Sequence, residues 1–155
     1  MSACEWTRDR FIVSCDPEKQ DRKVIAEFLA SSYWAKGISP ELVEKSLEGA
    51  LCFSLRDADR QVGFARVISD RATIAYLGDV FVLPEYRGIG LGKWLMQCVM
   101  SHPELQGLRR WILATRDAHG LYEKFGFTPL KSPDIFMERH DPNVYADGGR
   151  LKTNT

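Results

Sequence analysis

The feature that most constrains the fold is a glycine-rich segment between a strand-like run and an amphipathic helix. The run Thr73–Leu83 is the longest strand-like stretch in the chain, and Pro84 ends it. The segment RGIGLG follows at residues 87–92. The helix after it places its apolar residues on one face, at helical spacing: Leu91, Trp94, Leu95, Cys98 and Val99. This order of strand, loop and helix predicts a layered α/β structure.

The glycine-rich segment has the properties of a phosphate-binding loop. The first amides of a helix have no partner within the helix, and the helix dipole adds partial positive charge there. Glycines at 88, 90 and 92 let a ligand approach the backbone, and Arg87 and Lys93 could add charge. A Walker loop is excluded because Trp94 follows Lys93, and the dinucleotide fingerprint is excluded because Lys93 stands where it needs glycine.

The remaining elements are read from apolar periodicity and capping residues. Further strands are expected at Phe11–Cys15, Leu51–Leu55, Val62–Ile68 and Trp111–Ala114, with weak late candidates at Thr128–Leu130 and Ile135–Glu138. Helices are expected to start at Asp16, Ser39 and Asp117. Hairpins precede β-α-β crossovers, which predicts a mixed sheet. Gly78, in the middle of the long strand, predicts a β-bulge or a close backbone approach.

Length and composition favour a single globular domain over residues 1–155. Its core is expected at about 11–139, and the polar ends Met1–Arg10 and 141–155 are expected to be loose. Lysine plus arginine equals aspartate plus glutamate, at 21 each, so charge gives no argument for a nucleic-acid or membrane partner. With no signal-peptide pattern and no membrane-length apolar run, a cytoplasmic location is the default expectation.

Cysteines and histidines show no metal-ligand spacing. The four cysteines are scattered and form no C-x-x-C pair, and the three histidines do not combine with them in sequence. The sequence therefore predicts no metal site.

Two segments together resemble the GNAT superfamily of acetyltransferases. Residues 79–93 (DVFVLPEYRGIGLGK) resemble its central motif, in which Arg87, Gly90 and Gly92 match the pattern [RQ]-x-x-G-x-[GA] of the coenzyme A pyrophosphate loop. Residues 118–127 (AHGLYEKFGF) resemble its second motif. The resemblance implies an α/β (α+β) fold with a mixed central sheet of about six or seven strands. It also implies helices on both faces, and a splay between the fourth and fifth strands that admits pantetheine.

The resemblance also implies which residues bind acetyl-CoA. The backbone of Val80, Phe81 and Val82 would contact pantetheine and the acetyl carbonyl, and an amide near Phe81 or Val82 could stabilise the oxyanion. The pyrophosphate would lie on the loop formed by Arg87, Gly88, Ile89, Gly90, Leu91, Gly92 and Lys93. No metal is implied.

Catalytic roles follow from family position and side-chain chemistry. Tyr122 falls where the family often places a tyrosine beside the thioester sulfur, and a phenol can donate to the departing thiolate. The proton of the amine could go to Asp79, to Glu85 or to water. Two positions depart from common family versions, because Gly78 stands where glutamate is frequent and Thr115 stands where asparagine is frequent.

The acceptor is not identified by the sequence. Tyr33 and Trp34 are the expected acceptor-binding residues, and a small-molecule amine, an amino acid or a peptide N-terminus all fit. The expected activity is N-acetyl transfer by direct attack in a ternary complex, and a homodimer is a family-level expectation. The alternative is a non-catalytic acyl-CoA-binding sensor or interaction module.

Overall fold

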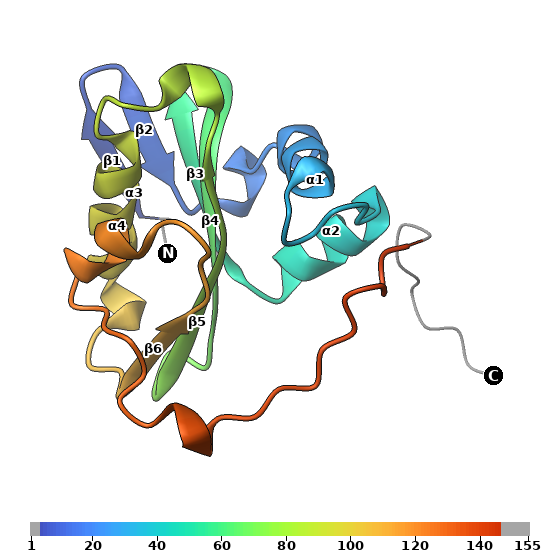
Figure 1. Ribbon diagram of the computed structural model, residues 1–155. Coiled ribbons are helices and arrows are strands. Elements are labelled where there is room, and N and C mark those ends of the chain that lie inside the picture. Colours follow the sequence, from blue (N-terminus) through green and yellow to red (C-terminus); the bar gives the residue numbers. More distant parts are fainter. Residues whose placement is uncertain (1–3, 147–155) are drawn as a thin grey trace.

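A computed structural model describes residues 4–146 and contains one six-stranded sheet (Figure 1). The strands are β1 (Glu5–Arg8), β2 (Phe11–Ser14), β3 (Leu51–Asp57), β4 (Arg60–Ser69), β5 (Ile74–Val82) and β6 (Arg110–Leu113). The helices are α1 (Arg22–Ser31), α2 (Pro40–Glu48), α3 (Leu91–Met100) and α4 (His119–Glu123). The strands lie in sequence order, and all neighbours are antiparallel except β5 and β6.

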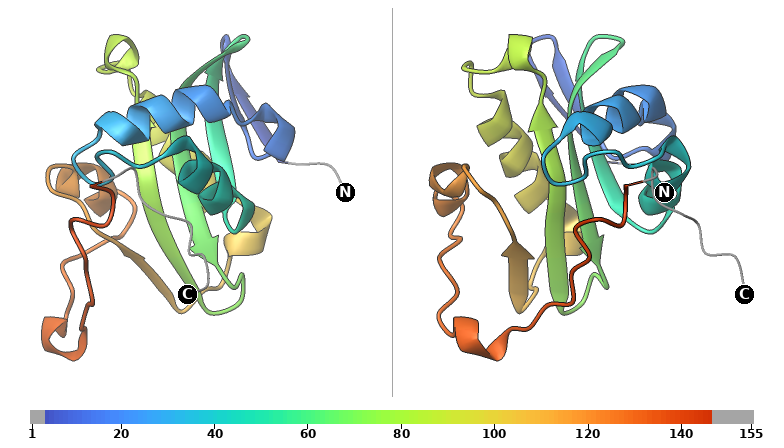
Figure 2. Two further views of the ribbon diagram at one scale, coloured as in Figure 1. Left: turned by 90° about the vertical axis from the view of Figure 1, so that its right-hand side faces the viewer. Right: turned by 45° about the vertical axis from the view of Figure 1, so that its right-hand side comes forward.

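The helices form a layer on each face of the sheet. Helices α1 and α2 cover one face, and α3 and α4 cover the other (Figures 1 and 2). Two separate apolar clusters fill these layers: one includes Leu95, Val99 and Tyr122, and the other includes Ile25, Val43 and Phe81. The predicted mixed sheet with helices on both faces is confirmed. No helix in the described part of the chain is long and apolar enough to cross a bilayer.

A bulge in β5 changes which face its side chains reach. Phe64 pairs with Phe81 and Arg66 pairs with Gly78, so two residues of β5 oppose one residue of β4. Before the bulge, Ala75 and Leu77 point toward the α3 side; after it, Phe81 points toward α1. There Phe81 stacks on Phe28, with ring centroids 3.9 Å apart. The bulge expected at Gly78 is therefore present, and its positive-φ residue is Asp79, with φ 56°.

Strands β5 and β6 pair over only part of their length. Ile74–Leu77 lies in parallel register with Arg110–Leu113. Beyond Leu77, β5 continues to Val82 and pairs only with β4 among residues 4–146. The two strands part where the bulge begins, which is the splay expected from the family resemblance. They were expected as the fourth and fifth strands and are the fifth and sixth because β1 precedes them.

The amino-terminal hairpin corrects one expectation. Residues 1–10 were expected to be loose, yet β1 pairs with β2 through a two-residue turn at Asp9 and Arg10. Asp9 adopts φ 56°, which aspartate tolerates better than most residues. Trp6 of β1 packs near Phe53, with ring centroids 6.1 Å apart, and this apolar contact ties the strand to the core.

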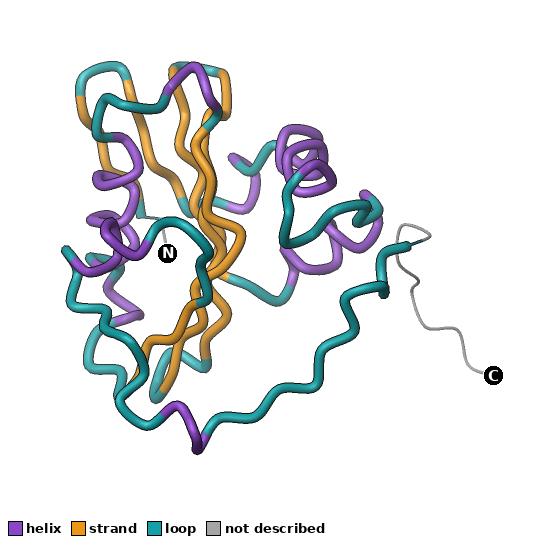
Figure 3. Tube along the Cα trace, viewed as in Figure 1, coloured by secondary structure: helices purple, strands orange, loops and turns teal. Residues whose placement is uncertain are grey.

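Two expected strands near the carboxyl end are wrong. Neither Thr128–Leu130 nor Ile135–Glu138 is a strand, and only a short 3-10 turn, Pro133–Ile135, occurs there. Pro129 and Pro133 remove backbone donors that a sheet would need. The segment instead runs beneath the sheet toward the α2 side (Figure 3), where Tyr145 joins the apolar cluster of α1 and α2.

Two of the three expected helix starts are also corrected. Asp16 caps a 3-10 turn, and α1 begins after Asp21, whose carboxylate accepts hydrogen bonds from the amides of residues 23 and 24. Helix α4 begins after Ala118 rather than Asp117, and Thr115 Oγ1 accepts the Ala118 amide hydrogen bond at 3.1 Å. The start at Ser39 is confirmed, because its hydroxyl accepts from the Leu42 amide.

Candidate functional site

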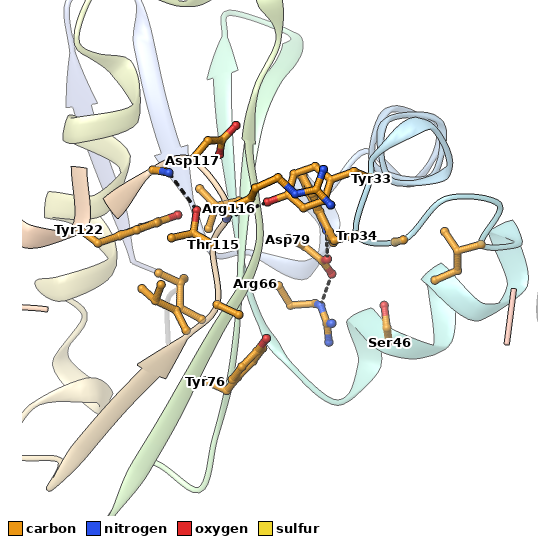
Figure 4. Close-up of a pocket in the computed structure, with 18 of the residues that line it drawn as sticks. Tyr33, Trp34, Ser46, Arg66, Tyr76, Asp79, Thr115, Arg116, Asp117 and Tyr122 are labelled. Atoms are coloured by element: carbon orange, nitrogen blue, oxygen red, sulfur yellow. Dashed lines mark hydrogen bonds and ion pairs between the residues drawn. The ribbon is translucent and has the colours of Figure 1, made fainter. Parts of the chain in front are cut away.

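A pocket of about 710 Å³ lies where β5 and β6 part, and elements from both layers line it (Figure 4). Tyr33 and Trp34 reach it from the connection between α1 and α2, and Tyr122 reaches it from α4. The bulge residues Gly78 and Asp79 form its wall on β5. The splay therefore provides a passage between the α1–α2 face and the α4 face.

Asp79 is the polar centre of this pocket. Its Oδ2 accepts a hydrogen bond from Arg66 Nε at 2.7 Å, and its Oδ1 accepts one from Trp34 Nε1 at 2.8 Å. The side chains of Arg66 and Asp79 are only 18% and 11% exposed, so this ion pair is largely shielded from water. Positive φ at a non-glycine residue stores strain, which the two charge-assisted bonds offset.

Tyr33 and Trp34 close the pocket from the α1–α2 side. Their rings meet edge to face with centroids 5.0 Å apart. The Tyr33 hydroxyl accepts a hydrogen bond from the Arg116 amide at 3.1 Å, and the Arg116 guanidinium lies 4.0 Å from the Tyr33 ring centroid. This contact joins the α1–α2 connection to the segment after β6, across the passage.

Tyr122 is the only pocket residue contributed by α4. Its side chain is buried against Phe127, and burial raises the pKa of its phenol to about 12. Within residues 4–146 its hydroxyl makes no hydrogen bond, although it points toward the pocket (Figure 4). Such a group remains a free proton donor at neutral pH.

The glycine-rich loop is open to solvent at the end of β5. Gly88 and Gly90 both adopt φ 84°, and Gly90 is the residue that precedes α3. A Cβ added at Gly88, Gly90 or Gly92 would meet no atom within 4 Å, so the space beside these three glycines is open. No side chain caps α3, which leaves its first amides free for an anion. Arg87 Nε donates to the Val82 carbonyl at 2.8 Å and lies across the base of the loop.

The structure separates the two carboxylates considered as the proton acceptor. Asp79 lines the pocket, whereas Glu85 forms a 3.0 Å ion pair with Arg60 and is not among the lining residues. Of the two carboxylates, only Asp79 could therefore contact a molecule bound in this pocket.

Arg66 and Arg116 were missed by sequence reasoning. Arg66 lies inside the apolar run Val62–Ile68, and a charge at such a position was the same signal that singled out Asp79. Arg116 lies in a loop and had no such signal. Tyr145 also lines the pocket, although it belongs to the segment expected to be a loose tail.

A second cluster brings together Cys4, Cys15 and His102, whose sulfur and nitrogen atoms lie within 4.8 Å of one another. Sequence spacing gave no indication of it, because β1 must first pair with β2 and bring Trp6 against His102, which follows α3. His102 Nδ1 accepts the Glu104 amide hydrogen bond at 3.1 Å, and burial lowers the pKa of the imidazole. The neutral ring therefore carries its proton on Nε2, which leaves no free lone pair for a metal.

Comparison with known proteins gives a consistent result. The family model described as acetyltransferase (GNAT) domain matches residues 48–129. A Gibberella zeae protein, itself assigned as an acetyltransferase, is 33% identical over 142 residues, which covers 77% of this chain and 79% of the relative. A crystal structure from Xanthomonas campestris, assigned to the GNAT family, is 53% identical with a TM-score of 0.86, and the match covers 88% of this chain and 96% of that one.

A more distant structure shows that the fold extends to diverged sequences. A GNAT family acetyltransferase from Streptococcus pneumoniae has a TM-score of 0.62 at 24% identity, and the match covers 84% of this chain and 99% of that one.

Proposed function

Because the chain belongs to the GNAT acetyltransferase family, we propose that it transfers acetyl from acetyl-CoA to a primary amine of a small molecule or peptide. The observation that carries this proposal is the passage at the splay. It joins a free phenol on one side, Tyr122, to an ion-paired carboxylate on the other, Asp79. A thioester in the passage would have a proton donor and a proton acceptor on opposite sides.

In this proposal acetyl-CoA, the acetyl donor, binds along the free edge of β5 and at the loop after it. Beyond Leu77 the β5 edge that faced β6 has no strand partner in the described chain, so an extended pantetheine arm could pair with Val80–Val82. The open backbone at Gly88–Lys93 and the uncapped start of α3 suit a pyrophosphate, and Arg87 and Lys93 add positive charge beside it.

The proposed reaction uses one direct attack and no covalent enzyme intermediate. The acceptor ammonium first gives a proton to Asp79, directly or through water, because only the neutral amine is a nucleophile. Its nitrogen then forms a bond to the thioester carbon, and an amide near Phe81 or Val82 stabilises the oxyanion.

Collapse of the tetrahedral intermediate completes the transfer. The carbon–sulfur bond breaks, Tyr122 gives its proton to the leaving thiolate, and the nitrogen releases its second proton to solvent, as Asp79 then does with the first. The phenolate then regains a proton from solvent. The net products are the N-acetylated amine and free coenzyme A.

The proposal is tested by measuring thiol release from acetyl-CoA with and without a panel of primary amines, together with mass detection of the acetylated product. Acceptor-dependent release with a matching product is expected. Tight acetyl-CoA binding without transfer to any amine would favour the non-catalytic acyl-CoA-binding module instead.

Asp79→Asn is expected to lower kcat by about 100-fold while leaving the affinity for acetyl-CoA unchanged. Asparagine tolerates positive φ and can still accept the Trp34 hydrogen bond, but its NH2 group would then face Arg66 Nε, so the change removes charge, basicity and the hydrogen bond from Arg66. Steady-state kinetics and calorimetry measure the two quantities.

Asp57→Asn is the matched control for this variant. Asp57 is 17% exposed, is ion-paired with Arg10 at 2.9 Å, accepts a hydrogen bond from Tyr86, and lies outside the pocket lining. The Asp57→Asn variant should have a lower free energy of unfolding and an unchanged kcat. Equal turnover in the two variants would remove Asp79 from the proton path.

A further inference from the structure

The guanidinium of Arg66 has donors that the protein does not use. Its Nε donates to Asp79, while Nη1 and Nη2 take part in no hydrogen bond or ion pair with residues 4–146. The side chain lines the pocket, and its far end extends past the Asp79 carboxylate between Tyr76 and Ser46 as viewed in Figure 4. A largely buried guanidinium with free paired donors is suited to bind a planar anion such as a carboxylate.

The charges around the pocket also favour an anion. Lys45, Arg66 and Arg116 line it, against the carboxylates of Asp79 and Asp117. Only Arg66 and Asp79 neutralise each other, and neither Lys45 nor Arg116 forms an ion pair within the described chain. The pocket therefore carries a positive excess although the whole chain has no net charge.

Arg66 and Asp79 together offer two opposite charges side by side. Each Asp79 oxygen accepts one hydrogen bond, and an ionised carboxylate has about four lone-pair sites, so the carboxylate can still receive an ammonium group. A ligand whose ammonium faces Asp79 and whose carboxylate faces Arg66 would satisfy both residues at once. An amine without an anionic group would leave the donors of Arg66 unpaired in a shielded site.

We propose that the acceptor is an aminocarboxylate of the α-amino-acid type, recognised by Arg66 through its carboxylate and by Asp79 through its amine. This rests on the proposed acetyl transfer and names its substrate class. The rings of Trp34 and Tyr76, each 41% exposed, line the same pocket and suit an apolar side chain. A peptide N-terminus lacks the adjacent carboxylate and is disfavoured.

The test compares acceptors that share a ring and differ in the anionic group: L-phenylalanine, L-phenylalaninamide and 2-phenylethylamine. The kcat/KM for phenylalanine is expected to exceed that for the other two by about 10-fold or more. O-Phosphoethanolamine is added as a phosphate-bearing amine. Equal or better use of the two acceptors without an anionic group would overturn the inference, and a preference for the phosphate compound would replace carboxylate recognition by phosphate recognition.

Arg66 also holds Asp79, so Arg66→Gln should lower turnover of both acceptors, and it should raise the KM for phenylalanine by about 10-fold or more relative to the KM for 2-phenylethylamine. Arg66→Lys keeps the charge and should recover part of the preference, and it also serves if the glutamine variant does not fold. Arg60→Gln is the matched control, because it removes an ion-paired guanidinium outside the pocket. Unchanged acceptor preference in both Arg66 variants would contradict the assignment.

Acetyl-CoA binding separates this inference from the function on which it rests. If the wild-type protein does not bind acetyl-CoA, the proposed function fails and the acceptor class fails with it. If it binds acetyl-CoA and acetylates amines without regard to their carboxylate, only the acceptor class is wrong.

Discussion

The Gly90→Val variant is expected to lose acetyl-CoA binding by about 100-fold or more, which corresponds to roughly 2.7 kcal/mol, while remaining folded. Gly90 precedes α3 with φ 84°, and its missing Cβ faces open space. A valine side chain would occupy the open space where the pyrophosphate is proposed to meet the backbone. It would also impose backbone strain of about 1–3 kcal/mol, because β-branched residues disfavour positive φ. Calorimetric titration with acetyl-CoA measures the affinity.

Gly107→Val separates the loss of the ligand site from backbone strain. Gly107 has φ 75°, has no atom within 4 Å of a built Cβ, and lies in the connection before β6, away from the loop. The two variants should show similar drops in Tm, and only Gly90→Val should lose affinity. Normal affinity in a folded Gly90→Val variant would remove the loop from the coenzyme site.

Tyr122→Phe is expected to lower kcat by about 100-fold or more with little change in acetyl-CoA affinity. Phenylalanine keeps the packing against Phe127 and removes the one hydroxyl that reaches the passage from α4. The loss should therefore fall on the step in which sulfur leaves. Pre-steady-state thiol release, compared with the equilibrium affinity, measures this directly.

The pH profile adds a second test of Tyr122. Burial raises the pKa of the phenol to about 12, so the protonated donor persists through pH 10. Ionisation of this residue should lower activity only as the pH approaches 12. A loss of activity centred near pH 9 that disappears in Tyr122→Phe would contradict the raised pKa.

Tyr86→Phe is the control for removing a phenol hydroxyl. Tyr86 donates to Asp57 at 2.7 Å and does not line the pocket, so this variant should lose about 1 kcal/mol of stability and keep its turnover. Normal turnover in folded Tyr122→Phe would leave Tyr122 with a packing role alone.

Local sequence patterns predicted the elements that carry the proposed acetyl-CoA site. Glycine and capping signals act over a few residues, so the end of β5, the loop and α3 could be recognised directly. The bulge was also predicted, but at the residue before the one with positive φ. Gly78 suggested it, but the positive-φ residue is Asp79, whose carboxylate is held by partners that the sequence does not place beside it.

Contacts between distant segments could not be predicted in the same way. Trp34 meets Asp79 across 45 positions, and Tyr33 meets Arg116 across 83, so both contacts depend on the completed packing of the layers. Arg66 was missed for the same reason, because it belongs to the site only through its ion pair with Asp79, 13 positions away. The two strand predictions near the carboxyl end were wrong because they gave the apolar residues more weight than Pro129 and Pro133, which remove backbone donors.

The most direct test of the central claim is calorimetric titration of the wild-type protein with acetyl-CoA, with ATP and NAD as controls. We expect micromolar binding of acetyl-CoA and no comparable binding of either control, because the loop matches neither the Walker nor the dinucleotide pattern. A folded sample that does not bind acetyl-CoA would contradict it.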